Sequence, residues 1–241
     1  MYLQKLTLTN FKNYSEAGMD FSEKINCFTG DNGAGKTNIL DAIYYLSFCK
    51  SYFNSIDSQN IKHNTDFFAI HGKYLRNASA VDKVSCVQKI NHRKQFRING
   101  DEYGRLADHI GEFPLVMVSP YDRDLINDGS EVRRKYIDGV ISQFNKPYLD
   151  ALLKYNKSLA QRNALLKHFA EHRTFNQETI DTYDIQLVEY GGQIHAWRTA
   201  FIRDFLPLFQ KYFEYISGGK EHVSIEYESQ LDDTKLDTLL K

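Results

Sequence analysis

Residues 30–37 read Gly-Asp-Asn-Gly-Ala-Gly-Lys-Thr, which fits the pattern G-x-x-x-x-G-K-[ST] at every position. A short apolar run at 25–29 precedes them and reads as a strand. Ile39, Ile43 and Leu46 follow at the i, i+4, i+7 spacing of a buried helix stripe. Strand, glycine-rich loop and helix in this order predict an α/β fold of the P-loop NTPase type.

The residues of this loop are suited to binding phosphates. Glycines allow backbone N–H groups to turn inward as an anion nest, and the following helix adds the positive end of its dipole. Lys36 is placed to reach the β- and γ-phosphates and the Thr37 hydroxyl to ligate Mg²⁺, so ATP and Mg²⁺ are the expected ligands. The alternative, a glycine-rich turn with an exposed lysine, is disfavoured by the flanking strand and helix. The predicted nucleotide-binding residues are Gly30, Asp31, Asn32, Gly33, Ala34, Gly35, Lys36 and Thr37.

The acidic half of an ATP-hydrolysing site is not found in the sequence. P-loop enzymes use an acid at the end of an apolar strand to hold Mg²⁺ and position water. The apolar run at 115–118 ends in Ser119 and Pro120, and residues 223–226 alternate in polarity. The sequence therefore predicts nucleotide binding without hydrolysis, and it assigns no catalytic residue.

The hydrophobic pattern divides the chain into a sheet-rich part and a helical part. Leu6 and Leu8 alternate with threonines as in a strand, and apolar residues recur at every second position in stretches of 67–103. The pair Asn99-Gly100 is typical of a type I′ turn, so we expect an antiparallel β layer there. Residues 113–118 read as one more buried strand.

From residue 128 onward the pattern is that of helices. Residues 128–131 have the spacing of a capping box, and Pro147 is placed to open the next helix. Apolar residues across 180–201 repeat at alternating spacings of three and four and match a similar set in 152–169, which predicts an antiparallel helical arm. The predicted domains are a P-loop ATPase lobe at 1–127, a helical arm at 128–219, and at 220–241 the start of a segment returning to the lobe, the rest of which we expect to be missing.

The charge of the chain is balanced overall but not locally. Lys and Arg number 30 against 31 Asp and Glu, a formal net charge of −1, which excludes a histone-like binder. Between His71 and Arg97 the basic residues are opposed only by Asp82, a footprint that suits a phosphate backbone, although a solvated sheet face alone also explains it. The candidate DNA contacts are Lys73, Arg76, Lys89, Arg93, Lys94 and Arg97.

Cysteine usage and hydropathy bound the location of the protein. Cys27, Cys49 and Cys86 are too far apart for a metal or redox pair, and we expect buried free thiols. The first residues do not resemble a secretory leader, and no apolar run approaches the length of a membrane span. The prediction is a cytoplasmic protein without a membrane partner.

A second motif competes with the phosphate loop. Residues 168–172 read His-Phe-Ala-Glu-His, which matches the H-x-x-E-H pattern of inverted zinc peptidases. They lie toward the end of an expected arm helix between Lys167 and Arg173, where a solvated face is the ordinary expectation. No third ligand is marked by context, so a zinc hydrolase is kept only as an alternative.

Five segments together carry a family resemblance. They are residues 8–14 (Leu-Thr-Asn-Phe-Lys-Asn-Tyr), the loop and helix at 30–46, Lys50-Ser51-Tyr52, Ile98-Asn99-Gly100, and the stretch from Ser119-Pro120 to Arg133-Arg134-Lys135-Tyr136-Ile137-Asp138. In this order they resemble the RecF family of bacterial recombination-repair ATPases, relatives of the SMC and Rad50 heads. The resemblance is specific over residues 1–145, while the helical arm agrees in kind more than in residues.

The resemblance implies an ABC-type ATPase head with a helical second domain, an ATP-dependent homodimer, and binding of single-stranded, gapped or double-stranded DNA. It further implies a role in DNA replication, recombination and repair, in which the protein assists RecO and RecR in placing RecA. By the family's pattern, Lys12 and Asn13 lie near the nucleotide. Family members are longer, with a signature and an acidic Walker B strand beyond Lys241, so their ATPase activity is not expected of this chain alone. Asp128 stands where the family usually has Gly.

Two classes of function follow from these observations. The leading interpretation is an ATP-, Mg²⁺- and DNA-binding module of the RecF type. The other is a structural or interaction fragment whose helical arm docks partner proteins while its phosphate loop is idle. Titration with nucleotide separates them, because only the first predicts an occupied loop.

Overall fold

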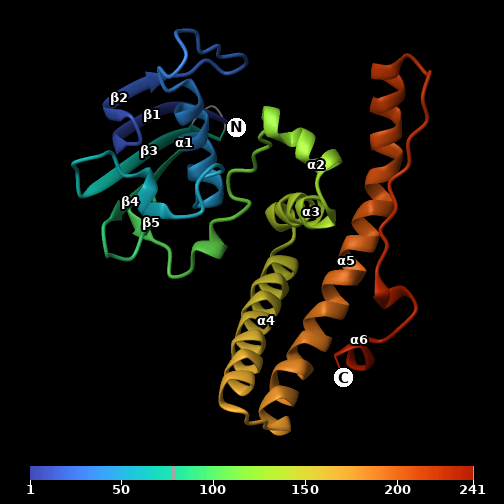
Figure 1. Cartoon of the computed structure of the whole chain (residues 1–241). Helices are drawn as coiled ribbons and strands as arrows, with labels where there is room; N and C mark the ends of the chain where they lie inside the picture. The colour runs from blue at the N-terminus through green and yellow to red at the C-terminus, as the bar shows by residue number, and fades with distance from the viewer. Residues whose placement is uncertain (77–79, 241) are drawn as a thin grey trace. The chain divides into compact units, whose positions relative to one another are not determined.

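The computed structural model describes residues 1–76 and 80–240, which form two compact units (Figure 1). The first unit comprises Met1–Asp122 and the second Arg123–Lys241. No helix in the described ranges is both long enough and apolar enough to cross a membrane.

The first unit is built on a six-stranded antiparallel sheet with the order β2-β1-β3-β4-β5-β6. Its strands are β1 (Tyr2–Phe11), β2 (Tyr14–Asp20), β3 (Phe67–Leu75), β4 (Val81–Lys89), β5 (Gln95–Ile98) and β6 (Asp101–Glu102). This unit also contains the helix α1 (Lys36–Phe48) and short 3₁₀ turns at Asp57–Asn60 and Leu106–Asp108. A third 3₁₀ turn, Pro120–Arg123, follows at the end of the unit. The predicted antiparallel layer is confirmed, and Asn99 and Gly100 both have the positive φ, 53° and 99°, of a type I′ turn.

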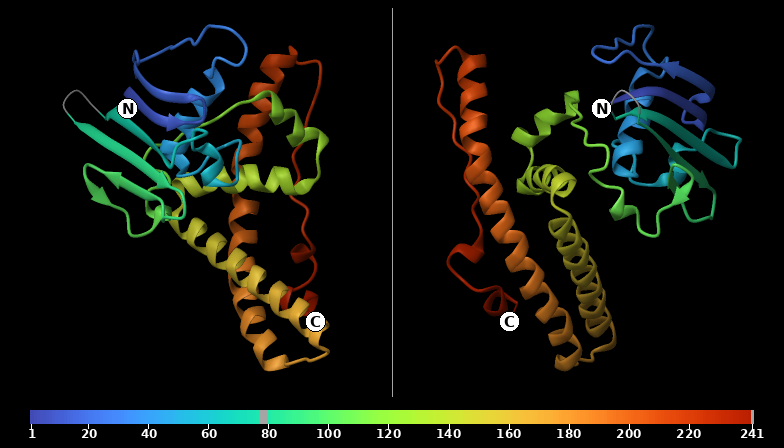
Figure 2. Two further views of the ribbon diagram at one scale, coloured as in Figure 1. Left: turned by 60° about the vertical axis from the view of Figure 1, so that its left-hand side comes forward. Right: turned by 180° about the vertical axis from the view of Figure 1, so that it is seen from behind.

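Helix α1 lies against one face of this sheet, as both views in Figure 2 show. The strands alternate in burial, so that Leu6, Phe68 and Ile70 are fully buried beneath the helix. Gly72 lies on the same face, where a Cβ would come within 2.5 Å of Cδ1 of Leu46. A glycine in β3 therefore lets the helix approach the sheet closely.

Two predicted strands are wrong. Residues 25–29 and 113–118 form no strand of the sheet in the described ranges. Ile25, Val116 and Val118 are 83%, 75% and 79% exposed. An apolar run becomes a strand only when a neighbouring strand pairs with its backbone groups, which a local pattern does not reveal.

Two smaller predictions also need correction. Cys27 lies in the first of these segments and is exposed, whereas Cys49 and Cys86 are buried free thiols as expected. The capping box at 128–131 is absent, because Gly129 occupies the N-cap and no side chain caps it. Asp128 instead ends the preceding helix, where its N–H donates to the carbonyl oxygen of Asp124 at 2.9 Å.

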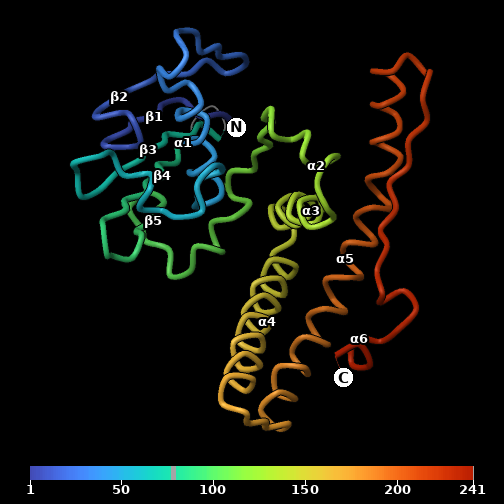
Figure 3. The backbone as a smooth tube through the Cα atoms, in the orientation of Figure 1, coloured from blue at the N-terminus to red at the C-terminus, as the bar shows by residue number. Residues whose placement is uncertain are grey.

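The second unit is helical. Its helices are α2 (Asp124–Asn127), α3 (Ser130–Phe144), α4 (Lys146–His172), α5 (Gln177–Ser217) and α6 (Leu236–Leu239), with a 3₁₀ turn at Gln230–Asp232. Figure 3 traces α4 and α5 as neighbouring coils that run in opposite directions, the predicted antiparallel arm. Ile180, Leu187 and Ile194 of the heptad pattern are buried. Asn145, one residue before α4, accepts a hydrogen bond from the N–H of Tyr148 at 2.9 Å, and Pro147 lies in the first turn as predicted.

Charged side chains at the start of this unit, Arg133 and Asp138, have structural partners. Arg133 donates to the carbonyl oxygens of Leu125 at 2.9 Å and Asp128 at 3.0 Å, which satisfies the end of α2. Asp138 accepts two hydrogen bonds from Arg198, at 2.9 and 2.8 Å. The side chains of this pair are only 15% and 14% exposed, so a bidentate ion pair ties α3 to α5.

Candidate nucleotide-binding site

The predicted phosphate loop lies between residues 25–29 and the N-terminus of α1. Gly33 and Gly35 have φ angles of +83° and +104°, a left-handed conformation that favours glycine. The first turn of α1 contains no acidic residue, and no side chain caps it. The positive end of the helix dipole therefore remains available to an anion at the loop.

Lys36 places its charge within the loop. Its ammonium group donates to the carbonyl oxygens of Gly30 at 2.7 Å and Asp31 at 2.8 Å. Thr37 is exposed beside it. The lysine and threonine that the motif assigns to phosphate and Mg²⁺ thus follow each other at the start of α1.

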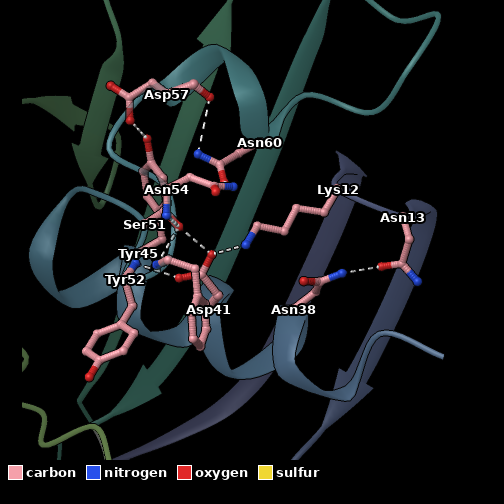
Figure 4. Close-up of polar contacts among 11 residues, drawn as sticks. Lys12, Asn13, Asn38, Asp41, Tyr45, Ser51, Tyr52, Asn54, Asp57 and Asn60 are labelled. Atoms are coloured by element: carbon pink, nitrogen blue, oxygen red, sulfur yellow. Dashed lines mark hydrogen bonds and ion pairs between the residues drawn. The ribbon is translucent and has the colours of Figure 1, made fainter. Parts of the chain in front are cut away.

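Asn13 braces the loop from the turn between β1 and β2 (Figure 4). Its amide donates to the carbonyl oxygen of Ala34 at 3.1 Å and accepts from Asn38 at 2.8 Å. The Tyr14 hydroxyl, whose pKa is raised by burial, reaches the same carbonyl at 3.5 Å. A Cβ on Gly35 would lie 2.6 Å from Nδ2 of Asn13, so this brace requires a glycine there.

Lys12, the neighbour of Asn13, is directed at the second turn of α1. Its ammonium lies 2.5 Å from a carboxylate oxygen of Asp41, whose side chain is fully buried. Asp41 also accepts from the Ser51 hydroxyl at 2.6 Å and from the Tyr52 N–H at 2.7 Å, as Figure 4 shows. Three donors thus surround this buried carboxylate, the arrangement that a charge inside a protein needs.

The same network continues to the Ser119-Pro120 segment. The Tyr52 hydroxyl donates to Oδ1 of Asp122 at 2.8 Å, and Oδ2 of Asp122 accepts from the Ser119 N–H at 2.7 Å. The roles of Asn38, Asp41 and Asp122 were not found from the sequence. The one available signal was an acidic residue inside the apolar stripe of a predicted helix, which calls for a buried cation.

Lys94 does not lie where the DNA hypothesis places it. Its ammonium donates to Asp57 at 2.6 Å and to the Tyr45 hydroxyl at 2.9 Å, and its side chain is only 10% exposed. Burial, with the nearby thiol of Cys86 and the bond to Asp57, raises the pKa of Tyr45 well above its usual range. The assignment of Lys94 as a DNA contact is therefore corrected, because its charge already neutralises a carboxylate.

The other candidate DNA contacts are distributed unevenly over the sheet. Arg76 pairs with Asp82 and with Glu112, and Arg97 pairs with Glu102 at 3.3 Å. Each retains 40–45% exposure of its side chain. Arg93 donates to the carbonyl oxygen of Gly104 at 2.8 Å, Lys89 is exposed at the end of β4, and Lys73 is half-buried within β3.

The zinc alternative gains no support from the helical unit. His168 and His172 stack with ring centroids 4.1 Å apart, and Nδ1 of His172 lies 3.0 Å from the carbonyl oxygen of His168. Within residues 1–76 and 80–240, no three or more His, Cys, Asp or Glu side chains gather closely enough to hold a metal ion.

A glycine-rich loop with an inserted lysine at the start of a helix, set beside a β-sheet, defines the class of P-loop ATPases. The model of the AAA ATPase domain family matches residues 1–196 of this chain. The predicted fold class is thereby confirmed.

Relatives with high sequence identity identify the family. The DNA replication and repair protein RecF of Flavobacterium johnsoniae is 48% identical over 241 residues, all of this chain and 67% of that protein. The protein of the same name from Phocaeicola vulgatus is 50% identical over 229 residues and is covered to 61% of its length. The solved recombination mediator protein RecF–ATP of the RecFOR pathway matches with a TM-score of 0.88 at 30% identity, over 99% of this chain and 66% of that one. The chain belongs to the RecF family of DNA replication and repair proteins, and it spans about two thirds of the length of these relatives.

Proposed function

We propose that this chain binds ATP with Mg²⁺ through residues 30–37 and serves as the nucleotide-binding part of a RecF-type DNA replication and repair protein. The observation that carries the proposal is Lys36, whose ammonium is held within a loop at the uncapped start of α1. Asn13 supports the loop from outside, in agreement with a place for Lys12 and Asn13 near the nucleotide. The ATP-bound relative of the same fold supports the choice of ligand.

Calorimetric titration with Mg²⁺-ATP tests this proposal against the idle-loop alternative. We expect Lys36→Ala to remove most of the binding, because no other ammonium is hydrogen-bonded to the loop carbonyls in the described chain. Lys24→Ala, a change at an exposed lysine of the same unit, is the matched control and should bind like the wild type. Equal affinity in all three proteins would show that the loop is not the site.

The second part of the proposal is that this chain alone does not hydrolyse ATP. Asp41 is engaged by Lys12, Ser51 and Tyr52, and Asp122 by Tyr52 and Ser119, so neither carboxylate is available to position water. The exposed apolar side chains of Ile25, Val116 and Val118 support a lobe that further strands complete. Steady-state phosphate release by the 241-residue chain, if Lys36→Ala abolished it, would contradict this part.

The cellular role is proposed from the family. The relatives' names place RecF in DNA replication and repair and in the RecFOR pathway, and we extend these settings to the protein containing this chain. DNA, RecO, RecR and RecA are its proposed partners, an ATP-dependent homodimer its proposed assembly, and the cytoplasm its proposed location. The sheet unit is the proposed ATPase lobe, and the helical unit is the proposed arm domain.

A further inference from the structure

Three lysines lie opposite one another on neighbouring strands of the first unit. Lys5 of β1 pairs in register with Lys73 of β3, and Lys73 pairs with Lys83 of β4. Residues paired across strands share a face of the sheet, and two strand spacings make the row about 10 Å wide. Together with Thr7, His71 and Ser85, the three lysines line a hollow of about 360 Å³.

This row faces away from the core. The next residues on the same strands, Leu6, Gly72 and Val84, are buried on the face that packs against α1. Because side chains alternate along a strand, the lysines emerge on the opposite, outer face. The row is separate from the phosphate loop, which is continuous with the start of α1.

The row carries three positive charges and forms no ion pair within the described residues. Among the described residues, no carboxylate lies within 4.0 Å of the three ammonium groups. Asp20, opposite Lys5 in the register, is the acid nearest to the row by strand pairing, and Glu102 is paired with Arg97. Like charges directly opposite each other destabilise a sheet, so an anion resting on the row would relieve a repulsion built into the fold.

The side chains around the hollow indicate which anion fits. Thr7 and Ser85 offer hydroxyl groups, which together with lysines are common donors to phosphate oxygens. None of the lining residues carries a phenyl, phenol or indole ring, the platforms on which unpaired bases stack in single-strand binders. The outer face thus suits a row of phosphates and not exposed bases.

We propose that the outer face at Lys5, Lys73 and Lys83 binds the phosphate backbone of double-stranded DNA without reading its sequence. This inference rests on the proposed DNA-binding role and relocates the contact. Of the six residues chosen from the sequence, only Lys73 belongs to the row. Arg97 lies opposite Ser85 on the next strand and extends the same face.

The test measures duplex affinity as a function of salt. A variant with Lys5→Gln, Lys73→Gln and Lys83→Gln is compared with the wild-type chain by fluorescence anisotropy on a 20-base-pair duplex, from 50 to 200 mM salt. The control variant carries Lys24→Gln, Lys157→Gln and Lys220→Gln, three exposed lysines outside the sheet with the same total charge change. Mg²⁺-ATP affinity is measured in all three proteins.

Each phosphate contact contributes about 0.9 to the log–log salt slope, so the row variant should lose roughly three units of slope. The ratio of the wild-type duplex affinity to that of the row variant should therefore fall by roughly 40-fold between 50 and 200 mM salt. The control variant should keep most of the slope, and ATP affinity should stay unchanged. Removing the repulsion should also raise the melting temperature of the row variant at low salt, which a merely structural role of the lysines would not do.

Three results would overturn the inference. An unchanged slope in the row variant would move the DNA contact elsewhere while leaving the proposed DNA-binding role intact. A wild-type chain without salt-dependent duplex affinity would remove both the inference and that role. The wild-type chain could also bind a single strand of 20 nucleotides more tightly than the duplex. If the row variant lost that single-strand binding, the occupant of the row would be single-stranded nucleic acid.

Discussion

Replacing Asp41 with Asn is the sharpest perturbation of the network behind the phosphate loop. Asn keeps the size of the side chain and an oxygen that can accept from the Tyr52 N–H, which lies 2.7 Å away. It removes the negative charge that faces the ammonium of Lys12. The substitution therefore isolates the effect of an uncompensated lysine from the effect of a cavity.

The structure gives the size of the effect. Breaking a buried ion pair by removing one partner costs about 3–5 kcal/mol. Lys12 keeps 12% exposure of its side chain, so part of its charge is still solvated, and we place the loss of stability near 3 kcal/mol. That free energy corresponds to roughly 150-fold faster opening of the region.

Hydrogen exchange measures this change locally. We expect amides of β1 and α1 to exchange roughly 150-fold faster in Asp41→Asn, while α4 and α5 are unaffected because they belong to the other unit. Glu131→Gln is the control, since its pair with Lys135 is about 72% exposed and should have no measurable effect. Acceleration below tenfold would refute the argument that the Lys12–Asp41 pair is effectively buried.

Two further predictions concern the loop and the helical unit. Gly35→Ala should weaken Mg²⁺-ATP binding more than Gly33→Ala, because both positions have positive φ but only a Cβ on Gly35 would meet Asn13; equal losses in calorimetry would show that the brace is irrelevant. Arg198→Met should destabilise the helical unit by about 3 kcal/mol by stranding Asp138, as followed in urea by fluorescence of Trp197, the only tryptophan. Arg203→Met, which removes an exposed pair, should leave that unfolding curve unchanged.

The sequence patterns correctly predicted those elements whose formation depends on residues close together in the chain. The alternation along β3 and β4, the Asn99-Gly100 turn and the heptad of α5 each depend on residues close in sequence, and all are present. The segment at 115–118 has the same apolar composition as a buried strand. It forms no strand of the described sheet, because a strand also needs a neighbouring strand in register, which a local apolar pattern does not reveal.

The candidate site divides in the same way. The loop at 30–37 is a contiguous pattern, so its sequence sufficed to define it. The contacts that surround it join residues far apart in sequence, such as Asn13 to Ala34 and Tyr52 to Asp122. Lys94 is a second example, in which the contact concerns charge. The sequence identifies a basic residue but does not reveal that Asp57 forms an ion pair with it.

The turn between β1 and β2 connects two separate parts of the sequence at this site, because its side chains contact α1. Lys12 adopts a left-handed φ of 53°, and its side chain and that of Asn13 reach different targets on α1. Those targets, Asn38 and Asp41, are three residues apart and therefore lie on one face of the helix. The Lys-Asn pair of the β1–β2 turn and the Asn-x-x-Asp pair of α1 thus form a single contact surface, which fixes the first two turns of the helix that presents Lys36 and Thr37. Substituting either the Lys-Asn pair or the Asn-x-x-Asp pair is therefore expected to remove the contacts of the other pair and to displace the loop.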